Sequence, residues 1–146
     1  MSFPPEIPEH KAWKYAQTEW ERSFLLDGPP LDLKQLRSKQ IEDRYLKQTN
    51  IRLRKTFDGK QKQYKLSKKV VLDQQTKRWI STLYLSEHEY ELFAQLPAFI
   101  LKKIRYYFDS GQKEPIGIDH IVLGKRELWM AEVEFASEVD LKAYSF

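Results

Sequence analysis

The stretch Met130-Ala131-Glu132-Val133-Glu134-Phe135 alternates apolar and acidic residues, the pattern of a β-strand with two different faces. Side chains two residues apart in a strand point to the same side of the sheet. Glu132 and Glu134 therefore share one face, and the apolar residues between and beside them pack on the other. The stretch predicts a strand that carries paired carboxylates on one side and core residues on the other.

A second acidic pair, Glu19 and Glu21, lies in a similar stretch near the other end of the sequence, over residues 18–25. If the two strands meet, four carboxylates share one space. Clustered anions repel one another strongly unless a cation lies among them. Carboxylate oxygens suit a hard divalent cation, so the two pairs predict a Mg²⁺ or Mn²⁺ site.

The strands expected between the two acidic pairs carry cations at matching intervals. These cations are Arg52 and Arg54, Lys65 and Lys69, and Lys103 and Arg105. A barrel built from such strands would have carboxylates on one side of its inner wall and cations on the other. Arginine forks bind phosphate oxygens in pairs and lysine adds a point charge. Such an interior fits a polyphosphate chain bridged to a metal.

An ordinary solvated surface produces the same pattern. A single Glu-x-Glu is common on the exposed face of an antiparallel strand, and an outer face of mixed charge alternates in the same way. The charged interior is favoured because several strands repeat the pattern with consistent sign.

Taken in order, these motifs resemble the CYTH domain, also called the triphosphate tunnel metalloenzyme superfamily. The resemblance extends from about residue 17 to residue 140, and it rests on the series, since no single motif is specific. The matching segments are Glu19-Trp20-Glu21, Asp43-Arg44-Tyr45-Leu46, Arg52-Leu53-Arg54, Leu66-Ser67-Lys68-Lys69, Lys103-Ile104-Arg105-Tyr106, Ile118-Asp119 and Ala131-Glu132-Val133-Glu134-Phe135.

The resemblance implies an α+β protein built on an antiparallel β-barrel of the triphosphate-tunnel type, with a few short helices outside. It implies a Mg²⁺- or Mn²⁺-dependent triphosphatase. Catalytic and metal-binding roles fall to Glu19, Glu21, Glu132 and Glu134, and phosphate binding to Arg52, Arg54, Lys65, Lys69, Lys103 and Arg105. Asp119 has three open roles: ligand of a second metal, partner of an interior arginine, or ordinary strand-end aspartate.

Two features depart from the family pattern. Ser23 stands where the signature has a lysine, which removes one charge facing the phosphates, and Arg22 beside it points to the other face. The sequence also ends soon after the second acidic strand. The expected consequences are an open or C-shaped barrel, a tunnel completed by a partner chain as in a homodimer, or a weak or inactive enzyme.

The substrate is left open among inorganic tripolyphosphate, thiamine triphosphate and nucleoside triphosphates, with cyclisation of ATP as a different outcome on the same scaffold. The rival function is a non-catalytic binder of polyphosphate or nucleotide. An RNA-binding barrel is a more remote alternative, because Trp20, Trp129 and Phe135 alternate with charged residues and are better read as core.

Composition is compatible with this interpretation. The 146 residues predict one domain with an N-terminal arm over residues 1–16. The net charge of +4 suits an anionic ligand without indicating nucleic acid. Cysteine is absent, which excludes disulfides, thiolate catalysis and cysteine-bound zinc. With no apolar run near the ~20 residues of a membrane helix and no apolar signal core, a cytoplasmic protein is expected.

Alternation and turn residues predict the secondary structure. A short helix is expected near Leu31, Leu33 and Leu36, another after Ser86 with Glu89 as its capping-box partner, and a third after Ser137. The apolar stripe of the second helix is expected to consist of Tyr90, Phe93, Ala94 and Leu96. A hairpin turn is expected at residues 58–60. Strands are expected at about residues 17–26, 39–46, 51–57, 61–72, 78–85, 99–109, 115–123 and 127–136.

Overall fold

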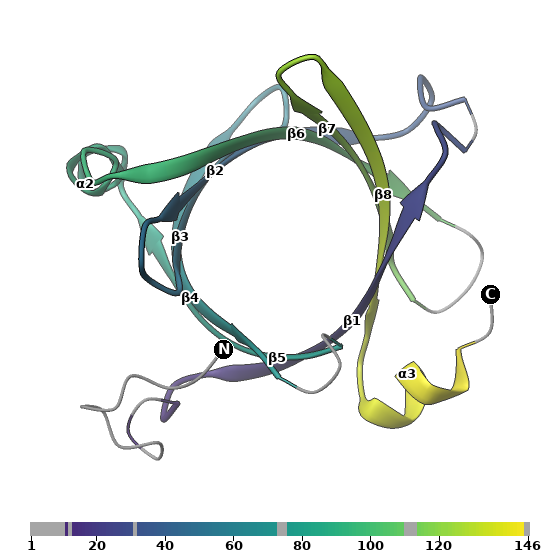
Figure 1. The fold of residues 1–146 in the computed structure, drawn as a ribbon, viewed down its shortest axis with the longest axis horizontal. Helices are drawn as coiled ribbons and strands as arrows, with labels where there is room; N and C mark the ends of the chain where they lie inside the picture. The colour runs from purple at the N-terminus through teal and green to yellow at the C-terminus, as the bar shows by residue number, and fades with distance from the viewer. Residues whose placement is uncertain (1–10, 12, 31, 73–75, 110–113, 145–146) are drawn as a thin grey trace.

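The computed structural model describes residues 11, 13–30, 32–72, 76–109 and 114–144, and within them eight antiparallel strands close into a barrel. Figure 1 looks along this barrel, with the helices labelled α2 and α3 outside the ring of strands. The order around the ring is β1-β5-β4-β3-β2-β6-β7-β8. The strands are β1 (Gln17–Leu26), β2 (Ser38–Leu46), β3 (Ile51–Phe57), β4 (Lys62–Val71), β5 (Lys77–Leu85), β6 (Ala98–Phe108), β7 (Ile116–Leu123) and β8 (Arg126–Phe135).

The barrel is closed by β1, which has a different neighbour along each half of its length. Residues 17–20 pair with β5, and residues 20–26 pair with β8. One long strand thus bridges the two edges of the sheet. The open or C-shaped alternative is therefore wrong, and no partner chain is needed to complete the ring.

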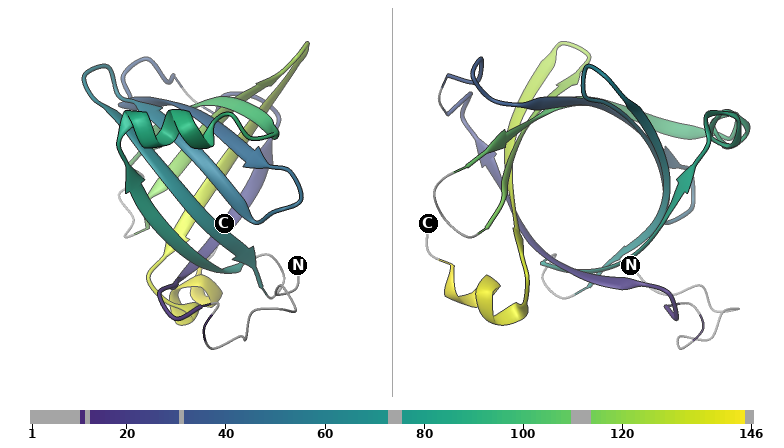
Figure 2. Two further views of the ribbon diagram at one scale, coloured as in Figure 1. Left: turned by 90° about the vertical axis from the view of Figure 1, so that its left-hand side faces the viewer. Right: turned by 180° about the vertical axis from the view of Figure 1, so that it is seen from behind.

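The helix α2 (Glu87–Phe93) covers one outer face of the barrel, as the side view in Figure 2 shows. Ser86 caps it: its hydroxyl accepts a hydrogen bond from the Glu89 amide, and the Glu89 carboxylate accepts one from the Ser86 amide. Tyr90 packs from the helix onto a buried cluster with Leu46, Leu53 and Tyr64. This cluster lies outside the ring, so residues that alternate with Leu53 face the interior.

A second outer cluster lies beneath the helix α3 (Glu138–Ala143), which begins after Ser137 as expected. Leu141 from this helix packs against Val133 and Phe135 of β8. Trp20 and Phe24 of β1 join the same cluster. The apolar residues that alternate with the acidic pairs are therefore core, as the sequence predicted, and the acidic residues face the other way.

All eight strands were predicted within about one residue at each end. The hairpin at residues 58–60 is confirmed, with Gly59 at a φ of 96° and Asp58 accepting hydrogen bonds from the amides of Lys60 and Gln61. In the N-terminal arm, the ring of Trp13 packs 5.1 Å from that of Trp79 on β5. Residues 1–10 of the predicted arm lie outside the described residues.

Two local predictions were wrong. The segment near Leu33 and Leu36 is a turn rather than a helix, held by a hydrogen bond from the Lys34 amide to the Asp32 carboxylate. Leu31 lies outside the described residues. In α2, Phe93 was expected on the apolar stripe but is exposed, because a helix of seven residues presents only one turn to the barrel and Tyr90 fills it. No helix in the described part of the chain has the length and apolar character to cross a membrane.

Candidate functional site

The two acidic pairs come together because their strands are neighbours in the barrel. Glu21 lies directly opposite Glu134, and Ser23 lies directly opposite Glu132, across the β1–β8 pair. The sequence prediction that the two strands meet is correct. The side chains of Glu21, Ser23, Glu132 and Glu134 all face the interior of the barrel. The residues that alternate with them, among them Trp20, Val133 and Phe135, pack on the outside.

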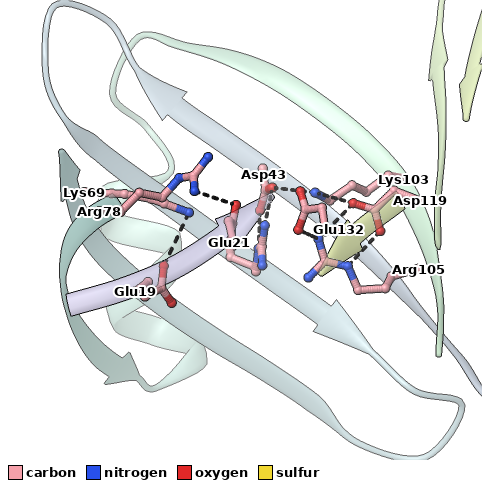
Figure 3. Close-up of polar contacts among 10 residues, drawn as sticks. Glu19, Glu21, Asp43, Lys69, Arg78, Lys103, Arg105, Asp119 and Glu132 are labelled. Carbon is pink, nitrogen blue, oxygen red and sulfur yellow. Dashed lines mark hydrogen bonds and ion pairs between the residues drawn. The ribbon is translucent and has the colours of Figure 1, made fainter. Parts of the chain in front are cut away.

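Charged side chains from all eight strands form one continuous layer inside the barrel, which we call the charged belt (Figure 3). It is not sealed from water, because the side chains of Glu19 and Lys69 are 31% and 25% exposed. The belt consists of Glu19, Glu21, Asp43, Arg52, Arg54, Lys69, Arg78, Lys103, Arg105, Asp119 and Glu132.

One bidentate pair in the belt joins Asp43 of β2 to Arg54 of β3, which are directly opposite in register. Arg54 donates from Nε and NH2 to the two carboxylate oxygens of Asp43, at 2.7 and 2.8 Å. Asp43 is fully buried. Burial raises the pKa of Asp43, but the hydrogen bonds and charge of Arg54 outweigh it and hold the pKa below its ordinary value of 3.8.

A second bidentate pair joins Arg105 of β6 to Asp119 of β7, again opposite in register. Arg105 donates to both oxygens of Asp119, at 2.7 and 2.8 Å, and its NH2 also reaches Glu132 at 3.0 Å. Lys103 lies 3.1 Å from Asp119 as well. Of the three roles left open for Asp119, the geometry matches the arginine partner.

A glycine makes room for this arrangement. A Cβ built on Gly117 would lie 3.3 Å from Cδ of Arg105, so a side chain at this position would press on the arginine. Gly117 lies directly opposite Glu132 in the β7–β8 pair. The missing side chain leaves Arg105 free to extend from Asp119 to Glu132.

The acidic pair on β1 is also matched with cations, over longer distances. Nζ of Lys69 lies 3.7 Å from Glu19, and NH1 of Arg78 lies 3.2 Å from Glu21. Burial raises the pKa of Glu21, and the charges of Glu132 and Glu19 raise it further against the opposing effect of Lys69 and Arg78. Burial also lowers the pKa of Lys69. Glu21 is thus a carboxylate whose charge its surroundings do not fully compensate.

The predicted site residues do not all join the belt. Lys65 lies nearer one end of the barrel, with its ammonium 5.2 Å from the ring centre of Tyr84. Glu134 and Ser23 are exposed. Two members were missed as site residues. Arg78 was assigned no role, although it opens a predicted strand, and Asp43 was treated only as part of a motif. Their positions relative to Glu21 and Arg54 follow from strand register, which the sequence does not give.

The carboxylates have the right chemistry for a hard divalent cation. One buried oxygen of Glu19 makes no hydrogen bond, and Glu21 is close enough to Glu19 and Glu132 for their charges to raise its pKa. Among the described residues, however, no three acidic or histidine side chains are gathered closely enough to enclose a metal ion. The donors fit Mg²⁺ or Mn²⁺, and in this structure they are paired with cations.

The two bidentate pairs predict acid sensitivity. Asp43 and Asp119 have pKa values below the ordinary 3.8 in the folded protein. Their contribution to stability is therefore complete above the unfolded pKa and is lost as the pH falls through the folded pKa. Glu21 acts in the opposite sense, because its raised pKa makes its charged form a cost that protonation relieves. We expect the free energy of unfolding to change little from pH 7 to 5 and to fall steeply below about pH 4.

Urea unfolding at a series of pH values measures how the free energy of unfolding depends on pH. An Asp43→Asn variant lacks one of the two titrating groups and should show a shallower acid limb than the wild type. Acid limbs of equal slope would contradict the assignment.

Solved structures similar to this chain share the barrel. The inorganic triphosphatase NE1496 is 22% identical with a TM-score of 0.53, over 88% of this chain and 80% of that one. A candidate adenylate cyclase from Bacillus halodurans is 14% identical with a TM-score of 0.60, over 88% and 86% of the two chains. The protein HpAC1 from Hippeastrum is 9% identical with a TM-score of 0.54, over 85% and 82%.

A scan against protein-family models finds no match, and a search of curated proteins finds none either. At these identities the structural likenesses establish the fold. The chain shares with these structures a closed antiparallel barrel, here of eight strands, and the barrel fold expected from the sequence is confirmed.

Proposed function

We propose that this protein binds a triphosphate inside the barrel and hydrolyses it with the help of Mg²⁺ or Mn²⁺. The observation that carries the proposal is the charged belt. It combines interacting carboxylates at Glu19, Glu21 and Glu132 with cations on the facing strands, and water reaches it. Among the similar structures, NE1496 is named an inorganic triphosphatase and HpAC1 is described with a dominant triphosphatase activity, which supports the same chemistry here.

The residues of the belt divide into two roles. Arg52 and Lys69 are the cations best placed to bind phosphate oxygens, because neither is held by a bidentate carboxylate. One nitrogen of Arg52, Nε, is buried without a hydrogen-bond partner. Arg54 and Arg105 are committed to Asp43 and Asp119, so they add positive charge and hold the wall rigid.

The carboxylates Glu19, Glu21 and Glu132 would hold the metal, with Glu134 beside them at the exposed edge. A bound divalent cation would supply charge to polarise the terminal phosphoryl group. Glu134, directly opposite Glu21, is the carboxylate we assign to orienting the attacking water.

Phosphate release tests this directly. The purified protein is assayed with tripolyphosphate, ATP and thiamine triphosphate, each with Mg²⁺ and with Mn²⁺. Release of orthophosphate that a Glu132→Gln change abolishes, and that a Glu42→Gln change on the outer face leaves intact, supports the hydrolase. Tight binding without release identifies the non-catalytic binder, and formation of cyclic AMP together with pyrophosphate from ATP identifies a cyclase. Absence of both binding and release would disprove the proposal.

Metal binding also predicts a change in stability. A cation bound only by the folded state should stabilise it by about 1.4 kcal/mol when free Mn²⁺ is tenfold above its dissociation constant. The change is measured from urea unfolding in EDTA and in Mn²⁺. A Glu21→Gln/Glu132→Gln variant should lose the response, whereas Glu42→Gln should retain it. An equal response in all three proteins would place the metal elsewhere.

A further inference from the structure

The two ends of the barrel interior differ in polarity. Neighbouring strands run in opposite directions, so moving two residues forward on β2 and β7, or two backward on β6 and β8, leads to the same end. From Asp43, Lys103, Asp119 and Glu132 of the charged belt, this step reaches Tyr45, Leu101, Ile121 and Met130. On each of these four strands, the belt residue nearest this end is therefore followed toward the end by an apolar or aromatic side chain.

The next positions toward the same end are apolar too and reach solvent. Phe99 lies directly opposite Tyr45, and Leu25 lies directly opposite Met130. Leu25 is 71% exposed, Phe99 57% and Tyr45 40%. We call this rim the apolar mouth and define it by Leu25, Tyr45, Phe99, Leu101, Ile121 and Met130.

The opposite end of the interior is mostly polar. There the belt is followed by Thr56 on β3, by Ser67 and then Lys65 on β4 and by Tyr107 on β6, and Lys39 lies directly opposite Arg105. The apolar residues next to the belt at this end are Ile41 on β2 and Ile80 on β5. The ring of Tyr107 has the cations of Arg37 and Lys39 beside it, 4.9 and 5.7 Å from its centre. A fully charged ligand such as inorganic tripolyphosphate would gain from this end and would gain nothing from the apolar mouth.

We propose that the substrate is an organic triphosphate, in which the phosphates lie in the charged belt and an aromatic or apolar group lies in the apolar mouth. Tyr45 joins the two regions, because it lies directly opposite Arg52 of the charged belt in the β2–β3 pair while its exposed ring is part of the mouth. A ligand with a charged phosphate chain at one end and an apolar group at the other would explain why exposed apolar side chains lie directly beside the phosphate-binding wall. This inference rests on the proposed function and narrows its substrate.

Two probes of equal charge separate the organic group from the phosphates. Methyl triphosphate and phenyl triphosphate carry the same phosphate chain and differ only in the group at its end. Calorimetric titration in saturating Mn²⁺ should give about tenfold tighter binding for the phenyl ester, since covering a good part of an aromatic ring is worth at least that factor. Tripolyphosphate serves as the reference for the belt alone.

Two exposed aromatic residues at opposite ends provide matched variants. Phe99→Ala removes a ring from the apolar mouth and should reduce the phenyl preference to about threefold or less, leaving tripolyphosphate affinity unchanged. Tyr84→Ala removes a ring at the polar end, where Tyr84 is 69% exposed, and should leave the preference intact.

The outcomes distinguish this inference from the function it rests on. Equal binding of methyl and phenyl triphosphate by the wild type would overturn the inference and leave triphosphate binding established. A preference that Tyr84→Ala removes and Phe99→Ala does not would overturn it too, because the organic group would lie at the polar end. No binding of any of the three probes would reject the proposed function and the inference together.

Discussion

Replacing Arg54 by methionine is expected to lower the free energy of unfolding by about 3–5 kcal/mol. Asp43 is fully buried and receives both of its short hydrogen bonds from this arginine. Removing the arginine leaves a buried carboxylate whose nearest remaining cation is Lys103, at 4.0 Å. Breaking one side of a buried pair costs far more than the pair contributes, because the remaining charge has lost its water and its partner.

Urea unfolding at pH 7 measures the loss. The control is Lys102→Met, which removes an exposed cation that lies 3.7 Å from Glu42 on the outer face, and it should cost under about 1 kcal/mol. The double variant Asp43→Leu/Arg54→Met removes both charges and should be more stable than Arg54→Met alone. A single variant no less stable than the control would mean that the pair does not hold the barrel wall.

The sequence predicted the fold well because the alternation of a strand is local. The apolar residues beside the acidic pairs at Glu19 and Glu132 identify the core side of β1 and β8 without knowledge of the neighbours. The capping box at Ser86 locates the start of α2 in the same way. Barrel closure was the exception, since it depends on the two halves of β1 pairing with different strands.

The site was predicted less completely, because ion pairing is decided by register between strands. Arg52 and Arg54 look equivalent in the sequence, but Arg54 lies opposite Asp43 and is committed to it, whereas Arg52 lies opposite Tyr45. Spacing identified which charges face inward. It could not show that the carboxylates would be paired with cations, nor that Arg78 would be among those cations.

That pairing leads to the second large effect, a strong coupling between metal and phosphate. We expect tripolyphosphate to bind about a hundredfold more tightly in saturating Mn²⁺ than without metal, or about 2.7 kcal/mol, and Mn²⁺ to bind more tightly by the same factor with tripolyphosphate. Without ligands, Glu132 holds the NH2 group of Arg105, and Glu19 lies near Lys69. A metal that takes Glu132 and Glu19 releases their hold on the NH2 group of Arg105 and on Lys69, which can then bind phosphate, and phosphate that takes these groups leaves the carboxylates to the metal.

Calorimetric titrations measure both affinities, with free concentrations corrected for the complex that tripolyphosphate forms with Mn²⁺. Glu132→Gln is the decisive variant, because it removes the carboxylate charge that competes with phosphate for the NH2 group of Arg105, while Arg105 stays paired with Asp119. It should strengthen metal-free binding of tripolyphosphate severalfold and reduce the coupling to about tenfold or less. Glu42→Gln, which alters a carboxylate on the outer face, should change neither the metal-free affinity nor the coupling. Any error in correcting for the complex of tripolyphosphate with Mn²⁺ affects this control and Glu132→Gln equally. Coupling that persists at full strength in Glu132→Gln would show that metal and phosphate attract each other directly, without the exchange of partners in the charged belt.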